Sequence, residues 1–250
     1  MIFRVFDIET VPDLSVWTKN DPQYQLAANG GVREVELFPP SQANQIVAIA
    51  YLDITLNIQQ SPKYSYVSHN TAAGWRPRHH ETMDLEKELL SNFATGIDDN
   101  VTLVSWNGRS FDCPVMAMRA LRLGLDWGWY YNSKKFRYRY SDDGHLDLMD
   151  SLADYGAARA SKLTDIAHLV GLPGKMDTNG SDVFQIVNTT MDHDRVANYC
   201  LQDVVQTALI FLRTRLLFGK INRQQFLECL ETFRVVAESV GISLNSIALV

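Results

Sequence analysis

The sequence predicts an α/β fold in which a mixed central β-sheet carries helices on both faces. An apolar, β-branched run that starts almost at residue 1 predicts an early buried strand. From residue 82 onward, short strand-like runs alternate with segments whose apolar residues recur at helical spacing. With 250 residues, of which 46% are hydrophobic and 21% charged, the chain is long enough to bury one large core. We therefore expect residues 1–250 to form a single domain.

The first third of the chain predicts strands. Residues 1–10, 44–54 and 63–69 are rich in apolar, β-branched and aromatic residues, and we expect them to pair as a meander. Between the first two, residues 12–44 contain several prolines and a glycine pair. That composition predicts a long, irregular surface excursion of the kind that often borders a site.

The remaining two thirds predict helices with two further short strands. The strands are expected at residues 101–107 and at the start of 145–156. The helices are expected at residues 82–97, 111–124, the end of 145–156, 161–171, 194–219 and 222–240. Gly124, Gly171 and Gly219 are the expected stops of three of them.

The composition restricts the class of function. A formal net charge of -6 argues against nucleic-acid binding by overall attraction and suits a protein that binds cations. Three cysteines without a CxxC pair indicate neither disulfides nor a structural zinc site, which favours a reducing compartment. The six histidines show no ligand spacing, so we expect them at the surface. The sequence has no leader pattern and no apolar run of membrane-spanning length, so we expect a cytoplasmic protein without membrane contact.

The stretch FDIETVPD places two acids, Asp7 and Glu9, inside the apolar first strand. Residues i and i+2 of a strand point to the same face, so the two side chains converge from backbone positions about 7 Å apart. That separation allows both carboxylates to bind one cation. The alternative is a solvated sheet edge, because short acidic pairs are common.

Two further acids occupy distinctive positions. Asp112 opens a helix directly after a strand, where an aspartate is explained equally well by N-capping. Asp203 lies in the middle of a long helix, where aspartate has low propensity, and Tyr199 shares its face one turn earlier. The alternative for this pair is a half-exposed helix face.

In combination these three patterns are specific. The order DxE, N-x3-F-D and Y-x3-D resembles the three exonuclease motifs of the DEDD superfamily of 3'-5' exonucleases. Tyr199 favours the DEDDy branch, because the DEDDh branch would have histidine at the position of Asn198. The phrases FDIETVPD, LVSWNGRSFDCPV, HLDLMDSL, GLPGK and YCLQDVVQT are most similar to the predicted 3'-5' exonuclease family related to the proofreading domain of family B DNA polymerases. The resemblance runs from residue 2 to about residue 215.

This resemblance implies an RNase H-like fold and phosphodiester hydrolysis with two divalent cations, Mg²⁺ or Mn²⁺. Asp7 would bridge both cations, Glu9 and Asp203 would complete the first, and Asp112 would hold the second. Tyr199 would orient the attacking water rather than act as a strong base, because an unperturbed tyrosine titrates near pH ~10.

Asp147, in HLDLMD, resembles a further acid of these enzymes, expected to support the metal ligands from behind. Hydrogen bonding at the end of a strand is the alternative explanation of this aspartate.

Substrate contacts are expected beside the second motif and in the stretch NSKKFRYRYSDDG. Asn107 is expected to shape the turn and, with Phe111, to touch the nucleotide. Lys135, Arg137 and Arg139 alternate with three aromatic residues on a segment predicted to be extended, as phosphate contacts and base-stacking rings would. The alternative is a hairpin with a solvated cationic face and a core-facing aromatic one.

The sequence therefore predicts a metal-dependent 3'-5' exonuclease that acts on the free 3' end of single-stranded or frayed DNA, releases nucleoside 5'-monophosphates and works in DNA repair. Two alternatives remain open. One is a non-catalytic nucleic-acid-binding or partner-docking module, and the other is a nuclease that trims RNA or small oligonucleotides.

Overall fold

The centre of the molecule is a mixed β-sheet with strand order β3-β2-β1-β4-β5. The fold is described from a computed structural model, which defines residues 1–29, 39–56, 70–71, 79–174, 180–190 and 192–244. The strands of these residues are β1 (Ile2–Pro12), β2 (Asn44–Thr55), β3 (Asn70–Thr71), β4 (Val101–Ser105) and β5 (His145–Asp147). β2 runs antiparallel to β1 and β3, whereas β4 runs parallel to β1 and β5.

The two central parallel strands separate before β1 ends. β1 pairs with β4 only from Ile2 to Val5, and then continues to Pro12 along β2. The register between β1 and β2 shifts between Glu9 and Thr10, which marks a bulge. Beyond Val5, no strand among the described residues accepts the N–H groups along this edge of β1. An opening of this kind, at the carboxyl ends of parallel strands, is where α/β folds commonly bind ligands.

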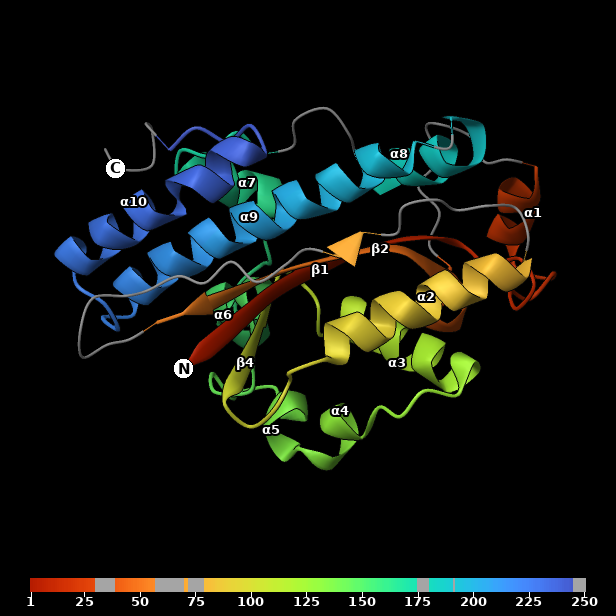
Figure 1. The fold of residues 1–250 in the computed structure, drawn as a ribbon, viewed down its shortest axis with the longest axis horizontal. Helices are drawn as coiled ribbons and strands as arrows, with labels where there is room; N and C mark the ends of the chain where they lie inside the picture. The colour runs from red at the N-terminus through yellow and green to blue at the C-terminus, as the bar shows by residue number, and fades with distance from the viewer. Residues whose placement is uncertain (30–38, 57–69, 72–78, 175–179, 191, 245–250) are drawn as a thin grey trace.

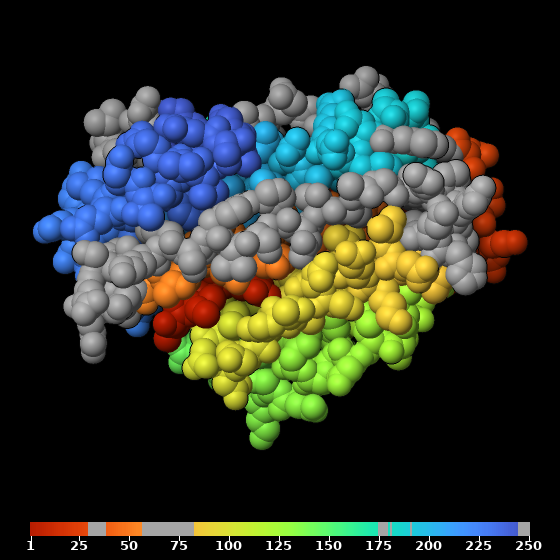
Figure 2. All heavy atoms as spheres, viewed as in Figure 1, coloured from red at the N-terminus to blue at the C-terminus, as the bar shows by residue number. Residues whose placement is uncertain are grey.

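Helices cover both faces of the sheet (Figure 1). α9 (His193–Leu217) packs on β1 and β2, and α7 (Leu163–Leu169) and α10 (Arg223–Ser239) pack against α9. α2 (His79–Ala94) and α3 (Asp112–Leu123) lie on the opposite face. In Figure 2 the blue spheres of α9 and α10 and the yellow and green spheres of the α2–α5 region occupy opposite sides of the molecule. The shorter elements are α1 (Pro22–Ala28), α4 (Gly128–Asn132), α5 (Lys134–Arg137), α6 (Leu148–Leu152), α8 (Gly180–Gln185), the 3₁₀ turns at Ser41–Ala43 and Asp154–Gly156, and a π turn at Ile186–Thr190.

Alternation along β1 divides the core into two layers. Phe3 and Val5 pack on the side of α9, whereas Phe6 and Ile8 pack on the side of α2 and α3. Both layers are strongly apolar, so β1 is buried on both faces as a central strand should be. The same alternation assigns the side chains of Asp7 and Glu9 to the α9 side.

The predicted α/β class, with a mixed sheet and helices on both faces, is confirmed. Gly124 closes α3 with a left-handed φ of 66°, which glycine adopts without strain. The predicted helix at 222–240 begins with a capping box, in which the Asn222 and Gln225 side chains bond each other's backbone N–H groups. Among the described residues, no helix is both long and apolar enough to span a membrane.

The irregular excursion predicted at 12–44 is wrong in part. Asp21 accepts a hydrogen bond from the Gln23 N–H and Pro22 occupies the first helical turn, so residues 22–28 form α1. Trp17 is buried beneath this helix rather than exposed in a loop. The predicted strand at 63–69 lies outside the described residues, although the adjoining Asn70–Thr71 pairs with β2.

The prediction that the stretch NSKKFRYRYSDDG, residues 132–144, is extended is also wrong. Residues 134–137 form the single turn of α5, closed by a hydrogen bond from the Tyr138 N–H to the Lys134 carbonyl. Phe136 is 1% exposed, and the centre of its ring lies 5.5 Å from the centre of a Trp129 ring. Burial of this one aromatic ring overrides the two-residue alternation that suggested a strand. The helices α4 and α8 were not expected from the sequence.

Candidate active site

The acids of β1 lie against the middle of α9. Ligand atoms of Asp7, Glu9 and Cys200 all lie within 4.8 Å of one another. The Cys200 thiol is 3.4 Å from the Asp7 carbonyl oxygen and 3.8 Å from its carboxylate Oδ2. Tyr199 and Asp203 share a face of the helix, and their side chains are hydrogen-bonded. Glu9 and Tyr199 are 8% and 6% exposed, whereas Asp7 and Asp203 are half-buried. Each pair therefore combines a buried side chain with a partly exposed one, which is less solvent contact than a solvated sheet edge would have.

Asp112 reaches the same strand from the opposite layer. Its Oδ1 accepts a hydrogen bond from the backbone N–H of Ile8 at 3.1 Å, and the residue is 3% exposed. This N–H belongs to the part of β1 that has lost β4 as a neighbour. The N-cap of α3 is Phe111, which makes no side-chain capping bond, so N-capping does not account for Asp112. The Asp112 carboxylate instead points to the backbone of β1 at Ile8, between Asp7 and Glu9.

The four carboxylates interact strongly. The pKa of Asp7 is raised well above its usual range, first by burial and then by the negative charges of Asp112, Glu9 and Asp203. Burial raises the pKa of Asp112 to about 7, and the Asp147 charge adds to this while backbone hydrogen bonds oppose it. Like charges at this spacing destabilise one another unless protons or cations neutralise them.

The donor chemistry of this cluster fits hard divalent cations. Carboxylate oxygens are the ligands that Mg²⁺ and Mn²⁺ prefer. The Tyr199 phenol sits beside them, and burial together with the charges of Glu9, Asp203 and Asp7 raises its pKa, so it remains protonated. The buried Cys200 was not predicted to be part of the site. Its position directly after Tyr199 was the only feature of the sequence that could have indicated it.

Asp147 organises the loop that leads into α3. Its carboxylate accepts hydrogen bonds from the backbone N–H groups of Asn107 at 2.9 Å, Arg109 at 3.0 Å, Met149 at 3.1 Å and Asp150 at 3.3 Å. It thereby caps α6 and fixes Asn107, which has a left-handed φ of 64°. Hydrogen bonding at a strand end, one of the two readings of this residue, is therefore present, and it holds the turn that precedes Asp112.

A buried polar group supports the same turn from below. The Ser105 Oγ lies 2.7 Å from His145 Nε2 and accepts a hydrogen bond from the Gly108 N–H. His145 Nδ1 faces the Cys113 thiol at 3.8 Å. His145 is 1% exposed, so the expectation of surface histidines is wrong for this residue. Burial and the nearby Arg109 charge lower its pKa, which keeps the ring neutral.

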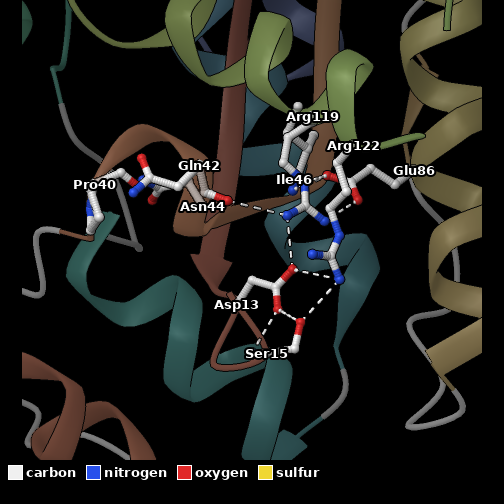
Figure 3. Close-up of polar contacts among 9 residues, drawn as sticks. All are labelled: Asp13, Ser15, Pro40, Gln42, Asn44, Ile46, Glu86, Arg119 and Arg122. Carbon is white, nitrogen blue, oxygen red and sulfur yellow. Dashed lines mark hydrogen bonds and ion pairs between the residues drawn. The ribbon is translucent and has the colours of Figure 1, made fainter. Parts of the chain in front are cut away.

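A second network ties α3 to the end of β1 (Figure 3). The Arg119 guanidinium binds both carboxylate oxygens of Glu86 at 2.6 Å and one oxygen of Asp13 at 2.8 Å. Glu86 also accepts a hydrogen bond from the Ile46 N–H of β2 at 2.9 Å. Arg119 follows Asp112 by two helical turns and so lies on the same face of α3. The sequence offered only that spacing as a signal for this network.

The predicted substrate contacts separate into two groups. Asn107 and Phe111 lie in the loop before Asp112, and Phe111 is 38% exposed. Lys135 instead donates to the carbonyls of Asp99 and Val101, at the end of β4 remote from Asn107. The Arg137 and Arg139 side chains contact other protein groups. Arg137 lies 5.1 Å from the centre of the Tyr131 ring, and Arg139 forms an ion pair with Asp150 at 2.6 Å.

Comparison with known proteins places the chain in a family. Residues 36–241 match the family described as predicted 3'-5' exonucleases related to the exonuclease domain of PolB. The matched range includes Asp112, Tyr199 and Asp203, whereas β1 precedes it. No curated protein matches the sequence.

The chain is also similar to a solved structure, the family B DNA polymerase from the hyperthermophilic archaeon Pyrobaculum calidifontis. The two share 16% sequence identity with a TM-score of 0.49, over 86% of this chain and 24% of the polymerase. This chain therefore spans about a quarter of the length of that polymerase. The family model matches residues 36–241, which is most of this chain. The chain therefore belongs to the family of predicted 3'-5' exonucleases related to the exonuclease domain of PolB.

Proposed function

We propose that this protein is a metal-dependent 3'-5' exonuclease that removes nucleoside 5'-monophosphates from single-stranded or frayed DNA. The observation that carries the proposal is the convergence of Asp7 and Glu9 from β1, Asp112 from α3 and Asp203 from α9 on one partly buried position. We further propose that residues 1–250 act as one exonuclease domain. Membership of the family supports a nuclease with a nucleic-acid substrate.

Phosphodiester hydrolysis needs positive charge at such a site. Four carboxylates would repel the substrate phosphate, so we assign them the task of binding two Mg²⁺ or Mn²⁺ ions. Bound divalent cations would supply the charge that attracts the phosphate, activates water and stabilises the leaving oxygen. In our assignment Asp7 would help to hold both cations, Glu9 and Asp203 would hold the first, and Asp112 would hold the second.

The other side chains of the site orient water and substrate. The protonated Tyr199 hydroxyl, aligned by Asp203, would hold the attacking water rather than remove its proton. The water oxygen bonds to phosphorus, the bond from phosphorus to the 3' oxygen of the preceding nucleotide breaks, and that oxygen ends as a hydroxyl group. Asn107 and Phe111 lie in the turn directly before Asp112 and are the proposed contacts to the terminal nucleotide. Lys135, Arg137 and Arg139 already contact protein groups, so we assign structural roles to all three side chains.

The test is digestion of a 5'-labelled single-stranded DNA oligonucleotide with Mn²⁺ or Mg²⁺. We expect a ladder that shortens from the 3' end and disappears with EDTA and in Asp7→Asn, which keeps the size of the side chain. The matched control is Glu231→Gln, on the exposed side of α10, which should digest like the wild type. The 3'-labelled strand should release a nucleoside 5'-monophosphate at once.

Three outcomes would contradict the proposal. Faster digestion of RNA than of DNA in direct competition would favour an RNA-trimming nuclease. Tight oligonucleotide binding without hydrolysis of either, by a folded protein supplied with Mn²⁺, would favour a non-catalytic binding module. Digestion that persists in Asp7→Asn would exclude the assigned metal site.

A further inference from the structure

Three tyrosines lie side by side next to α6 and are here called the tyrosine surface: the exposed Tyr138 and Tyr140, and the half-buried Tyr155. Tyr138 and Tyr140 are 59% and 56% exposed, unusually much for large aromatic residues. The ring centres of Tyr138 and Tyr140 lie 5.8 Å apart, and those of Tyr140 and Tyr155 lie 5.0 Å apart, each pair in a T-shaped arrangement. The rings are therefore arranged against one another while their outer faces remain in solvent.

Arg139 holds these rings in place. Its guanidinium makes two hydrogen bonds to the Asp150 carboxylate, at 2.7 and 2.6 Å, and a third to the Tyr155 carbonyl at 3.3 Å. The same guanidinium lies 6.0 Å from the centre of the Tyr140 ring. The ion pair with Asp150 leaves little free positive charge, so this surface is aromatic rather than cationic in character.

The backbone that presents Tyr155 is strained. Asp154 and Tyr155 have φ values of 48° and 54°, the left-handed region that non-glycine residues rarely adopt. Two successive residues in this conformation persist only where surrounding contacts hold them, and such strain concentrates at functional positions. Here the strain turns an aromatic ring toward Tyr140 at the surface instead of into the core.

Arg109 connects the tyrosine surface to the candidate active site. Its guanidinium donates to the backbone carbonyls of Phe136, Tyr138 and His145. Its own backbone N–H donates to Asp147, in the loop that leads into Asp112 three residues later. The chain that carries Tyr138 is thus attached to the loop that carries an acid of the site.

We propose that the tyrosine surface stacks with unpaired bases of a single-stranded nucleic acid whose 3' end lies among the four carboxylates. This inference rests on the proposed exonuclease function and extends it to a binding site upstream of the hydrolysed bond. Every base offers a flat face to an aromatic ring, so the surface accepts any sequence but not paired bases. Because Arg139 is neutralised by Asp150, these contacts add affinity that depends little on salt, unlike phosphate contacts.

The test measures binding separately from hydrolysis. Fluorescence anisotropy with 5'-labelled oligo(dT) of three and of twelve nucleotides is recorded with Ca²⁺ in place of Mg²⁺ and Mn²⁺. Carboxylates bind Ca²⁺, but its looser coordination geometry does not suit the hydrolysis, so no digestion is expected. Tyr140→Ala should bind the longer strand about tenfold more weakly, the loss of roughly one stacked base, and should bind the shorter strand unchanged. Tyr140→Phe keeps the ring and should bind like the wild type. Tyr131→Ala removes a 48%-exposed tyrosine outside the surface and serves as the control.

The results separate this inference from the proposed function. Equal binding of the longer strand by Tyr140→Ala and the wild type, with matching thermal unfolding, overturns the tyrosine surface even if the protein digests DNA. An equal loss on both strand lengths also overturns it, because it would indicate a disturbed 3'-end site. A length-dependent loss that persists at high salt supports it, whether or not hydrolysis is detected.

Discussion

Asp112 Oδ1 accepts a hydrogen bond from the backbone N–H of Ile8, the residue that separates Asp7 from Glu9, at 3.1 Å. The bond joins α3 to the part of β1 that β4 no longer reaches. It satisfies a strand donor that would otherwise be buried without a partner. It also fixes an acid from one helical layer beside acids that face the other layer. A backbone donor thus determines where the fourth carboxylate lies.

Asp112→Asn should separate charge from structure. The amide oxygen can still accept the Ile8 hydrogen bond, while one of four mutually repelling charges is removed, so stability in EDTA should stay within about 1 kcal/mol of the wild type. The rise in melting temperature that Mn²⁺ produces should be smaller, and digestion should slow by at least about 10²-fold. Thermal unfolding with and without Mn²⁺ measures both effects. A marked fall in melting temperature in EDTA would mean that the carboxylate charge itself is structural.

Local patterns drew attention to the four acids, and their combined resemblance to the exonuclease motifs made them a predicted site, but no pattern indicated the residues that support them. Asp7 and Glu9 are visible because a strand has a period of two, and Asp203 is visible because aspartate is unfavourable inside a helix. Arg119 pairs with Asp13 at a separation of 106 residues, which no local pattern encodes. The alternation at 134–140 failed because burial of Phe136 in the core outweighs the pattern of its neighbours.

Arg119→Met should strongly destabilise the protein. Its removal leaves the Glu86 and Asp13 carboxylates buried without their principal cation, which typically costs about 3–5 kcal/mol. The double variant Arg119→Met with Glu86→Leu should recover part of that loss, because it also removes the Glu86 carboxylate, one of the two charges that Arg119→Met leaves without a cation. Urea unfolding measures the differences, and Arg234→Met, at an exposed pair on α10, should change stability by less than about 0.5 kcal/mol. If Arg119→Met alone is as stable as the wild type, this network contributes little to the free energy of unfolding.

Asp13 should make stability sensitive to acid. Burial opposes ionisation of this carboxyl, but hydrogen bonds from Ser15 and Arg119 and the charges of Arg119 and Arg122 lower its pKa overall. The folded-state pKa therefore lies below the unfolded value, so this stabilisation is present above the unfolded value and is lost as the pH falls through the folded one. The free energy of unfolding of Asp13→Asn should be about 1–3 kcal/mol below that of the wild type at pH 7. The two should approach each other below pH ~4, and a constant difference across the titration would contradict the assignment.

Tyr199→Phe should lower the rate without weakening metal binding. The hydroxyl is bonded to Asp203 and stays protonated, because burial and the charges of Glu9, Asp203 and Asp7 raise its pKa above the usual range. Loss of one positioned hydroxyl group should slow digestion by about 10²-fold, with the Mn²⁺-induced thermal shift unchanged. The wild-type pH–rate profile should show no tyrosine ionisation below pH ~10. A rate equal to that of the wild type would remove Tyr199 from the proposed mechanism.

Gly108→Ala should disturb the turn that delivers Asp112. A Cβ at this position would lie 2.4 Å from the Ser105 Oγ and 2.6 Å from its Cβ, both inside a buried hydrogen-bonded group that cannot give way. We expect a loss of about 1–3 kcal/mol in stability and a weaker thermal response to Mn²⁺, since the loop before the acid must shift. Adding Ser105→Gly removes both clashing atoms and should restore part of the metal response, although the bond to His145 is lost. Gly180→Ala, whose Cβ would meet no atom within 4 Å, is the matched control. If Gly108→Ala loses stability but keeps the full Mn²⁺ response, the turn supports the fold without positioning Asp112.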